Sequence, residues 1–196
     1  KVDNDRHVML AVTDIHLSNQ NSDIEQFCTR FIPDVRAVAE SFGDTPVYSL
    51  NMGDSAWDGY WYTNRYSLKD FRRTMNIVGY PAQMFCAMGN HDNDGATIHS
   101  DSVDWAASAP YRRIIGPRYY SFNIGKIHYV VMDDIDCSGY DGTDSRNYVK
   151  SLSGEQLDWL AKDLSYVAKT TPVVVAMHAQ VFYPTTTGFK IDHDSA

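Results

Sequence analysis

The sequence has few cysteines, and their spacing argues against a cysteine-rich zinc knuckle. The three cysteines are Cys28, Cys86 and Cys137, and no two of them form the CxxC or CxxxC pair that such sites use. Their odd number leaves at least one thiol outside any intramolecular disulfide. Cys86 lies inside an apolar run, so we expect it to be a buried core residue.

Positive charge and long apolar runs are also scarce. The chain has 17 Lys and Arg against 25 Asp and Glu, a formal net charge of -8, and it carries no basic stripe, which disfavours a passive nucleic-acid-binding surface. No apolar run approaches the ~18 residues that a membrane span needs. The acidic balance suits a site that collects cations. Export, which the Tyr-rich and Lys-poor composition favours, and a cytoplasmic location both stay open. No feature of the sequence indicates an oligomeric state.

What the 196 residues do contain is an alternation of strand-length and helical segments. Each short apolar run leads directly into Asp, Asn or His: "HVMLAVTD", "VYSLNMGD", "MFCAMGNHD", "IHYVVMDD" and "VVVAMHA". Residues 24–43 and 153–169 carry helix-like apolar spacing, with Pro33 marking a kink or a helix start in the first and Ser153 and Gln156 at capping-box spacing in the second. Because no repeat or linker divides the chain, we predict one α/β domain over residues 1–196.

The polar residues that follow these strands are the candidate site, since ligands of α/β folds bind at the carboxyl ends of the strands. Asp14 and His16 stand two positions apart, so an extended strand end would point both the same way. The later strands end at Asp54, Asn90, His91, Asp92 and His178.

The chemistry of this donor set predicts a site for divalent transition metals. Carboxylate and amide oxygens with imidazole nitrogens suit Mn, Fe or Zn better than Ca alone. Asp54 could bridge two ions, and two ions about 3.5–4 Å apart would hold the attacking and leaving oxygens of a phosphoryl group.

The ordered motifs DxH, GD, GNHD and a strand-end His, with the segments "GPRYYSFNIGKIHYVVMDD" and "LSGEQLDWLAKDL", resemble the calcineurin-like metallophosphoesterases. The resemblance covers about residues 8–181. It implies a four-layer α/β/β/α sandwich, a dinuclear site of two divalent transition metal ions (Mn, Fe or Zn), and a small phosphate monoester or diester as the substrate. The protein is therefore expected to be a metal-dependent phosphoric ester hydrolase.

The resemblance also implies a role for each candidate residue. Asp14 and His16 would bind the first metal, Asp54 would bridge both, and Asn90 and His178 would bind the second. A metal-bridging hydroxide would be the nucleophile.

The same resemblance implies that His91 is not a ligand. It would stabilise the transition state and protonate the leaving oxygen, while Asp92 would orient its imidazole ring.

Two departures from the family pattern matter. The final GHxH motif does not occur, so we expect a domain cut before its last strands, with an incomplete site and weak or no activity of its own. The later His193 is not expected to be a ligand. Trp57 stands where purple acid phosphatases carry an iron-binding Tyr, so we expect no purple chromophore.

Other interpretations stay open. A catalytically impaired module of the same fold would bind a partner or ligand instead, although His91 beside Asp92 favours an enzyme. Residues 90–101 loosely fit an EF-hand calcium loop, but a helix should enter such a loop and "AQMFCAMG" predicts a strand. The aromatic stretch "WDGYWYTNRY" is either satellite core, which we favour, or a wall beside the site.

Overall fold

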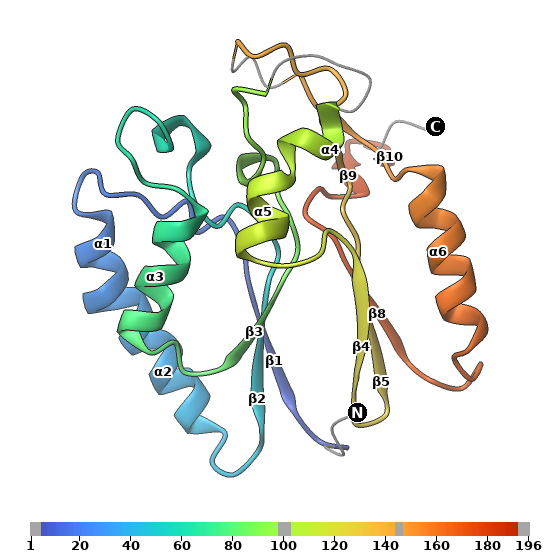
Figure 1. The fold of residues 1–196 in the computed structure, drawn as a ribbon. Helices are drawn as coiled ribbons and strands as arrows, with labels where there is room; N and C mark the ends of the chain where they lie inside the picture. Colours follow the sequence, from blue (N-terminus) through green and yellow to red (C-terminus); the bar gives the residue numbers. More distant parts are fainter. Residues whose placement is uncertain (1–4, 98–102, 144–146, 192–196) are drawn as a thin grey trace.

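The computed structural model describes residues 5–97, 103–143 and 147–191, and two three-stranded sheets form its centre (Figure 1). The first sheet is parallel and contains β1 (Val8–Val12), β2 (Val47–Asn51) and β3 (Gln83–Cys86). The second contains β4 (Tyr120–Ile124), β5 (Ile127–Val131) and β8 (Val173–Ala176), with β4 antiparallel and β8 parallel to β5. Two small antiparallel pairs are β6 (Ile135–Asp136) with β7 (Val149–Lys150), and β9 (Phe182–Thr185) with β10 (Gly188–Ile191).

Helices cover the outer face of each sheet, as Figure 1 shows. On the side of the first sheet lie α1 (Asp23–Gln26), the π-helical turn η1 (Phe27–Phe31), α2 (Ile32–Ser41) and α3 (Leu68–Val78). On the side of the second sheet lies α6 (Gly154–Ser165). The shorter elements are α4 (Val103–Ala107), α5 (Ala109–Ile114) and the 3-10 turns η2 (Asp58–Tyr60) and η3 (Asn90–Asp92). The order helix, sheet, sheet, helix confirms the predicted four-layer α/β/β/α sandwich.

The core lies in separate layers, which explains why the central strands are apolar on both faces. Between the sheets, Leu50, Val131 and Ala176 pack together, and the rings of Phe85 and Phe122 stack with centroids 3.8 Å apart. Burying a side chain of this size contributes roughly 1.5–3 kcal/mol. Cys86 is only partly buried, contrary to expectation, because β3 lies at an edge of its sheet among the described residues.

The predicted helix over residues 24–43 forms as one continuous helical segment with a π-helical turn in its middle. The backbone N–H of Ile32 bonds to the carbonyl of Phe27, one residue further back than in an α-helix, and Pro33 follows at the start of α2. A proline has no N–H to donate and suits the first turn of a helix. Pro33 therefore marks the start of α2, one of the two roles expected from the sequence.

Helix α6 begins where the sequence predicts, but its buried face differs from the apolar pattern. Ser153 caps it by accepting a hydrogen bond from the backbone N–H of Gln156. The Gln156 side chain does not complete a capping box. It is 3% exposed, and its amide group donates to the carbonyl of Asp133 at 2.8 Å and accepts from the Asp133 N–H at 3.0 Å. Leu157, which the pattern places on the apolar stripe, is 46% exposed.

Among the residues that the structure describes, no helix has the length and apolar character that crossing a membrane requires.

Candidate metal centre

The loops after β1 and β2 hold three candidate ligands in an unusual backbone conformation. Asp14, His16 and Asp54 have φ values of 51°, 46° and 57°, in the left-handed region that non-glycine residues avoid. The loops hold each other in place, because the N–H of Asp14 donates to the carbonyl of Gly53 and that of His16 to the carbonyl of Asp54. The expected reason for the pairing of Asp14 with His16, an extended strand end, is wrong, since β1 ends at Val12. Strained backbone of this kind concentrates at functional sites.

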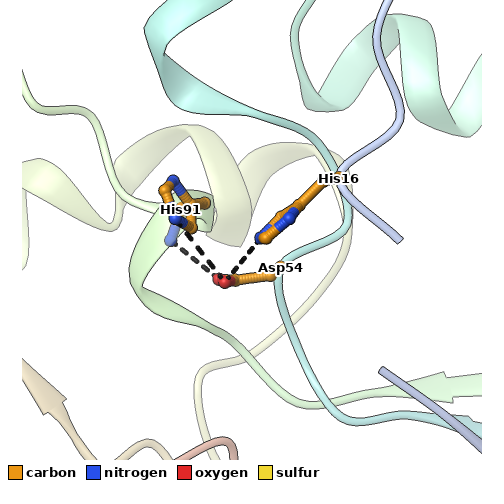
Figure 2. Close-up of side chains that lie close together, drawn as sticks. All are labelled: His16, Asp54 and His91. Carbon is orange, nitrogen blue, oxygen red and sulfur yellow. Dashed lines mark hydrogen bonds and ion pairs between the residues drawn. The ribbon is translucent and has the colours of Figure 1, made fainter. Parts of the chain in front are cut away.

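Asp54, whose carboxylate is the centre of the site, is 2% exposed. Its Oδ2 atom lies 2.9 Å from Nε2 of His16, 3.5 Å from that of His178 and 3.9 Å from that of His91. Figure 2 shows the imidazoles of His16 and His91 pointing at this carboxylate from two different loops. Burial alone would raise the pKa of Asp54, but the hydrogen bond from His16 and the nearby charges of His178 and His91 hold that pKa below its usual value. The same hydrogen bond raises the pKa of His16.

His178 follows β8 and is oriented by the main chain. Its Nδ1 donates to the carbonyl of Met52 at 2.9 Å, which leaves Nε2 facing the site. Metal-binding histidines are commonly held by such a bond from the second ring nitrogen. Nε2 lies 3.0 Å from Oδ1 of Asn90, within hydrogen-bond distance. The backbone N–H groups of His178 and Ala179 both donate to Asp134, which shapes the turn.

The described donors form two overlapping sets that suit divalent cations, with the carboxylate of Asp54 in both. Within each set the donor atoms lie within 4.8 Å of one another, and the sets are His16, Asp54 and His91, and Asp14, Asp54 and His178. Asp14 lies with His178 in one set, and His91 lies with His16 in the other. The Asp14 side chain is 51% exposed and lies 3.9 Å from Nε2 of His16. Mixed carboxylate and imidazole donors fit transition metals.

The glycines of the GD and GNHD motifs allow the loops to approach this closely. A Cβ atom on Gly89 would lie 2.2 Å from Oδ1 and 2.4 Å from the backbone N of Asp54. A Cβ atom on Gly53 would lie 2.7 Å from Nδ1 of His178, and its φ of +108° also favours glycine. Any side chain at either position would push the ligand-bearing loops apart.

His91 is buried, and its ring is fixed by a residue that the sequence interpretation missed. Its Nδ1 donates to Oδ1 of Asp58 at 2.7 Å, and both residues are 7% exposed. The backbone N–H of His91 donates to Oδ1 of Asp54 at 2.8 Å. The signal in the sequence is a second aspartate four residues after the GD motif.

The prediction that Asp92 orients the His91 imidazole is wrong. The Asp92 carboxylate accepts hydrogen bonds from the backbone N–H groups of Asp54, Ser55 and Gly89, each at 2.9 Å. These bonds occupy both of its oxygens and clamp the GD loop to the GNHD turn. Burial, with the nearby charge of Asp54, raises the pKa of Asp92 to about 7. Asp92 is thus a structural residue of the site.

The aromatic stretch after Asp54 divides into two parts. Trp61 and Tyr66 belong to the hydrophobic core under the helices, as favoured from the sequence. Trp57 does not join this core: its indole stacks on the imidazole of His91 with ring centroids 4.5 Å apart. This residue therefore lies against the site.

The remaining candidate features are structural. Strand β3 precedes the turn of Asn90–Asp92. An EF-hand needs a helix at that place, so this turn is not an EF-hand loop. Asp101 and His193 lie outside the described residues.

The fold and the donor set define the class of α/β/β/α sandwich proteins with a candidate centre for two cations. The chain belongs to the calcineurin-like phosphoesterase family, whose model matches residues 7–195. This confirms the resemblance seen in the sequence. Family membership makes metal-dependent phosphoesterase the general class of activity and a phosphate ester the class of substrate.

One solved structure agrees at the level of the fold. A dimetal phosphatase from Danio rerio superposes with a TM-score of 0.57 at 11% identity, over 88% of this chain and 69% of that one. A structure described as "Termus thermophilus Sulfate thiohydrolase SoxB in complex with glycerol" gives a TM-score of 0.41 at 16% identity, over 76% and 28% of the two chains. A search of curated proteins gave no match.

Proposed function

We propose that the protein hydrolyses a phosphate monoester or diester at a centre of two divalent cations, with His91 protonating the leaving oxygen. One observation carries this proposal: imidazole nitrogens of His16, His178 and His91 all lie within 3.9 Å of one buried oxygen of Asp54. Such a carboxylate can serve two cations at once. The fold supports the proposal, because a solved structure of similar fold is a dimetal phosphatase.

Five residues would hold the cations, which we propose to be Mn, Fe or Zn. Asp14 and His16 would hold the first, Asn90 and His178 the second, and Asp54 both. When bound, the cations would neutralise phosphoryl charge and lower the pKa of coordinated water.

His91 is suited to the leaving group because both ring nitrogens have a defined task. Nδ1–H is held by Asp58, so the Nε2 side faces the Asp54 carboxylate and the space where a phosphoryl group would bind. A proton on Nε2 can pass to the departing oxygen while the Asp58 carboxylate stabilises the charged ring. Asp58 thus takes the orienting role first assigned to Asp92.

The test is hydrolysis of an aryl phosphodiester and an aryl phosphomonoester side by side, by the gene product expressed through its natural C-terminus and loaded with Mn²⁺. We expect turnover of at least one ester, and its loss in His91→Ala. The ratio of the two rates assigns the ester class. Bound Mn²⁺ without turnover of either ester would contradict the proposal and support the module that binds a partner or ligand.

A further inference from the structure

We propose that Trp57 is a positioning residue for His91, whose indole fixes the plane of the imidazole and so the direction of Nε2. The inference rests on the proposed function, because the direction of Nε2 matters only if this atom serves the leaving group. It goes beyond the proposed ligands and the Asp58–His91 pair, since Trp57 offers neither a metal ligand nor a proton.

The geometry shows why the hydrogen bond to Asp58 is not sufficient. The covalent bond at Cγ and the hydrogen bond at Nδ1 hold two points of the ring, and the ring can still tilt about the line through them. The indole of Trp57 lies at 26° to the imidazole of His91, with centroids 4.5 Å apart, so it covers one face of the ring. The ring of His16 contacts the imidazole nearly at right angles, at 77° and 4.7 Å. Stacking and edge contacts of this kind restrict tilting.

Trp57 also contacts His16 directly, which links the acid to a candidate metal ligand. Their centroids are 4.8 Å apart at an interplanar angle of 80°. The rings of Trp57, His16 and His91 therefore pack against one another in three pairs. A tilt of the His91 ring would require either of the other two rings to move.

Three consecutive residues build this support. Trp57 has an extended backbone with φ −78° and ψ 111°, and the 3-10 turn begins at Asp58. The chain thus places the indole of Trp57 against the face of the His91 ring, and the carboxylate of Asp58 at Nδ1 of that ring. Gly59 leaves room for the indole, because a Cβ atom there would lie 2.8 Å from Nε1 and 3.1 Å from Cδ1 of Trp57. Gly59 is not among the positive-φ glycines, so space is the reason for a glycine there.

The experiment compares three variants with the wild type. Trp57→Leu removes the flat ring, Trp57→Phe keeps one, and Gly59→Ala displaces the indole without removing it. The substrates are phenyl and 4-nitrophenyl esters of whichever phosphate class the wild type hydrolyses. Phenol resembles the tyrosine side chain, with a pKa of about 10, and its departure depends on protonation. The more acidic 4-nitrophenol departs with far less help.

We expect Trp57→Leu and Gly59→Ala to lower kcat on the phenyl ester at least ~10-fold, because misplaced catalytic groups lose that much or more. The 4-nitrophenyl ester should change less than about 3-fold, a small part of a general-acid effect. KM should stay unchanged, and Trp57→Phe should retain most of the activity. Equal losses on both esters, or no loss on either, would overturn the inference.

A second readout does not depend on turnover. In the metal-free protein, the C–H resonances of the His91 ring, assigned with His91→Ala, should be shifted by the indole ring current and should move in Trp57→Leu. Unmoved resonances would overturn the stacking itself. If the wild type hydrolyses neither ester, the proposed function fails. If the wild type is active and Trp57→Leu leaves the ratio of the rates on the two esters unchanged, only the role of Trp57 is overturned.

Discussion

Asp58 Oδ1 accepts a hydrogen bond from His91 Nδ1 at 2.7 Å, and both side chains are buried. The two residues come from different loops, one after β2 and one after β3, so only the folded chain brings them together. Asp92, which directly follows His91 in the sequence, binds backbone N–H groups instead. The two aspartates should therefore respond differently to substitution.

For Asp58→Asn, we expect kcat to fall roughly 10- to 100-fold, because the charge that stabilises the protonated imidazole is lost while the shape is kept. Unfolding free energy and bound Mn²⁺ should change little. The measurement is steady-state kinetics on the phenyl ester together with metal analysis. Retention of full activity would show that His91 does not depend on Asp58.

For Asp92→Asn, we expect loss of stability. An amide cannot accept with both ends, so at least one of three backbone N–H groups loses its partner, at a cost of about 1–3 kcal/mol. Urea denaturation of the metal-free protein measures this. A fully stable Asp92→Asn with an activity defect as large as that of Asp58→Asn would restore the orienting role of Asp92.

Gly89→Ala should destabilise the protein by about 1–3 kcal/mol or more, because the new methyl group overlaps the Asp54 backbone and carboxylate. Bound Mn²⁺ should fall with it. Gly116→Ala is the matched control, since a Cβ atom at Gly116 meets nothing within 4 Å, and its effect should stay within about 0.5 kcal/mol. Similar unfolding midpoints for the two variants would disprove the close approach of the loops.

Gln156→Ala should cost about 2–3 kcal/mol, because the buried N–H and C=O groups of Asp133 both lose their partner. Leu157→Ala, on the next residue of α6, should cost less than about 1 kcal/mol, since Leu157 is 46% exposed. Urea denaturation of both variants compares them. A larger loss in Leu157→Ala would show that the apolar pattern, and not the observed contacts, defines the buried face.

The sequence predicts the layers and the candidate ligands because both depend on local patterns. Apolar runs of strand length end in Asp14, Asp54, Asn90 and His178, and parallel strands bring such ends together. The ordered family motifs then predict which of these residues belong to the same site.

Other features depend on contacts that no local pattern contains. Asp58 becomes the partner of His91 only through the fold of two loops, and Gln156 is buried because it fits the end of β5. Trp57 also illustrates this: its stretch is aromatic throughout, and only three-dimensional packing separates it from the core residues Trp61 and Tyr66.

The most direct test of the account is the Mn²⁺ affinity and stoichiometry of three proteins, each expressed through its natural C-terminus: the wild type, Asp54→Asn and His91→Ala. We expect two Mn²⁺ per wild-type chain, a loss of affinity of more than ~100-fold in Asp54→Asn, and nearly unchanged binding in His91→Ala, because loss of a direct ligand should exceed the 10–100-fold effect of its supporting residues. If His91→Ala lost Mn²⁺ as completely as Asp54→Asn, His91 would be a ligand, and its proposed role as the acid would be wrong.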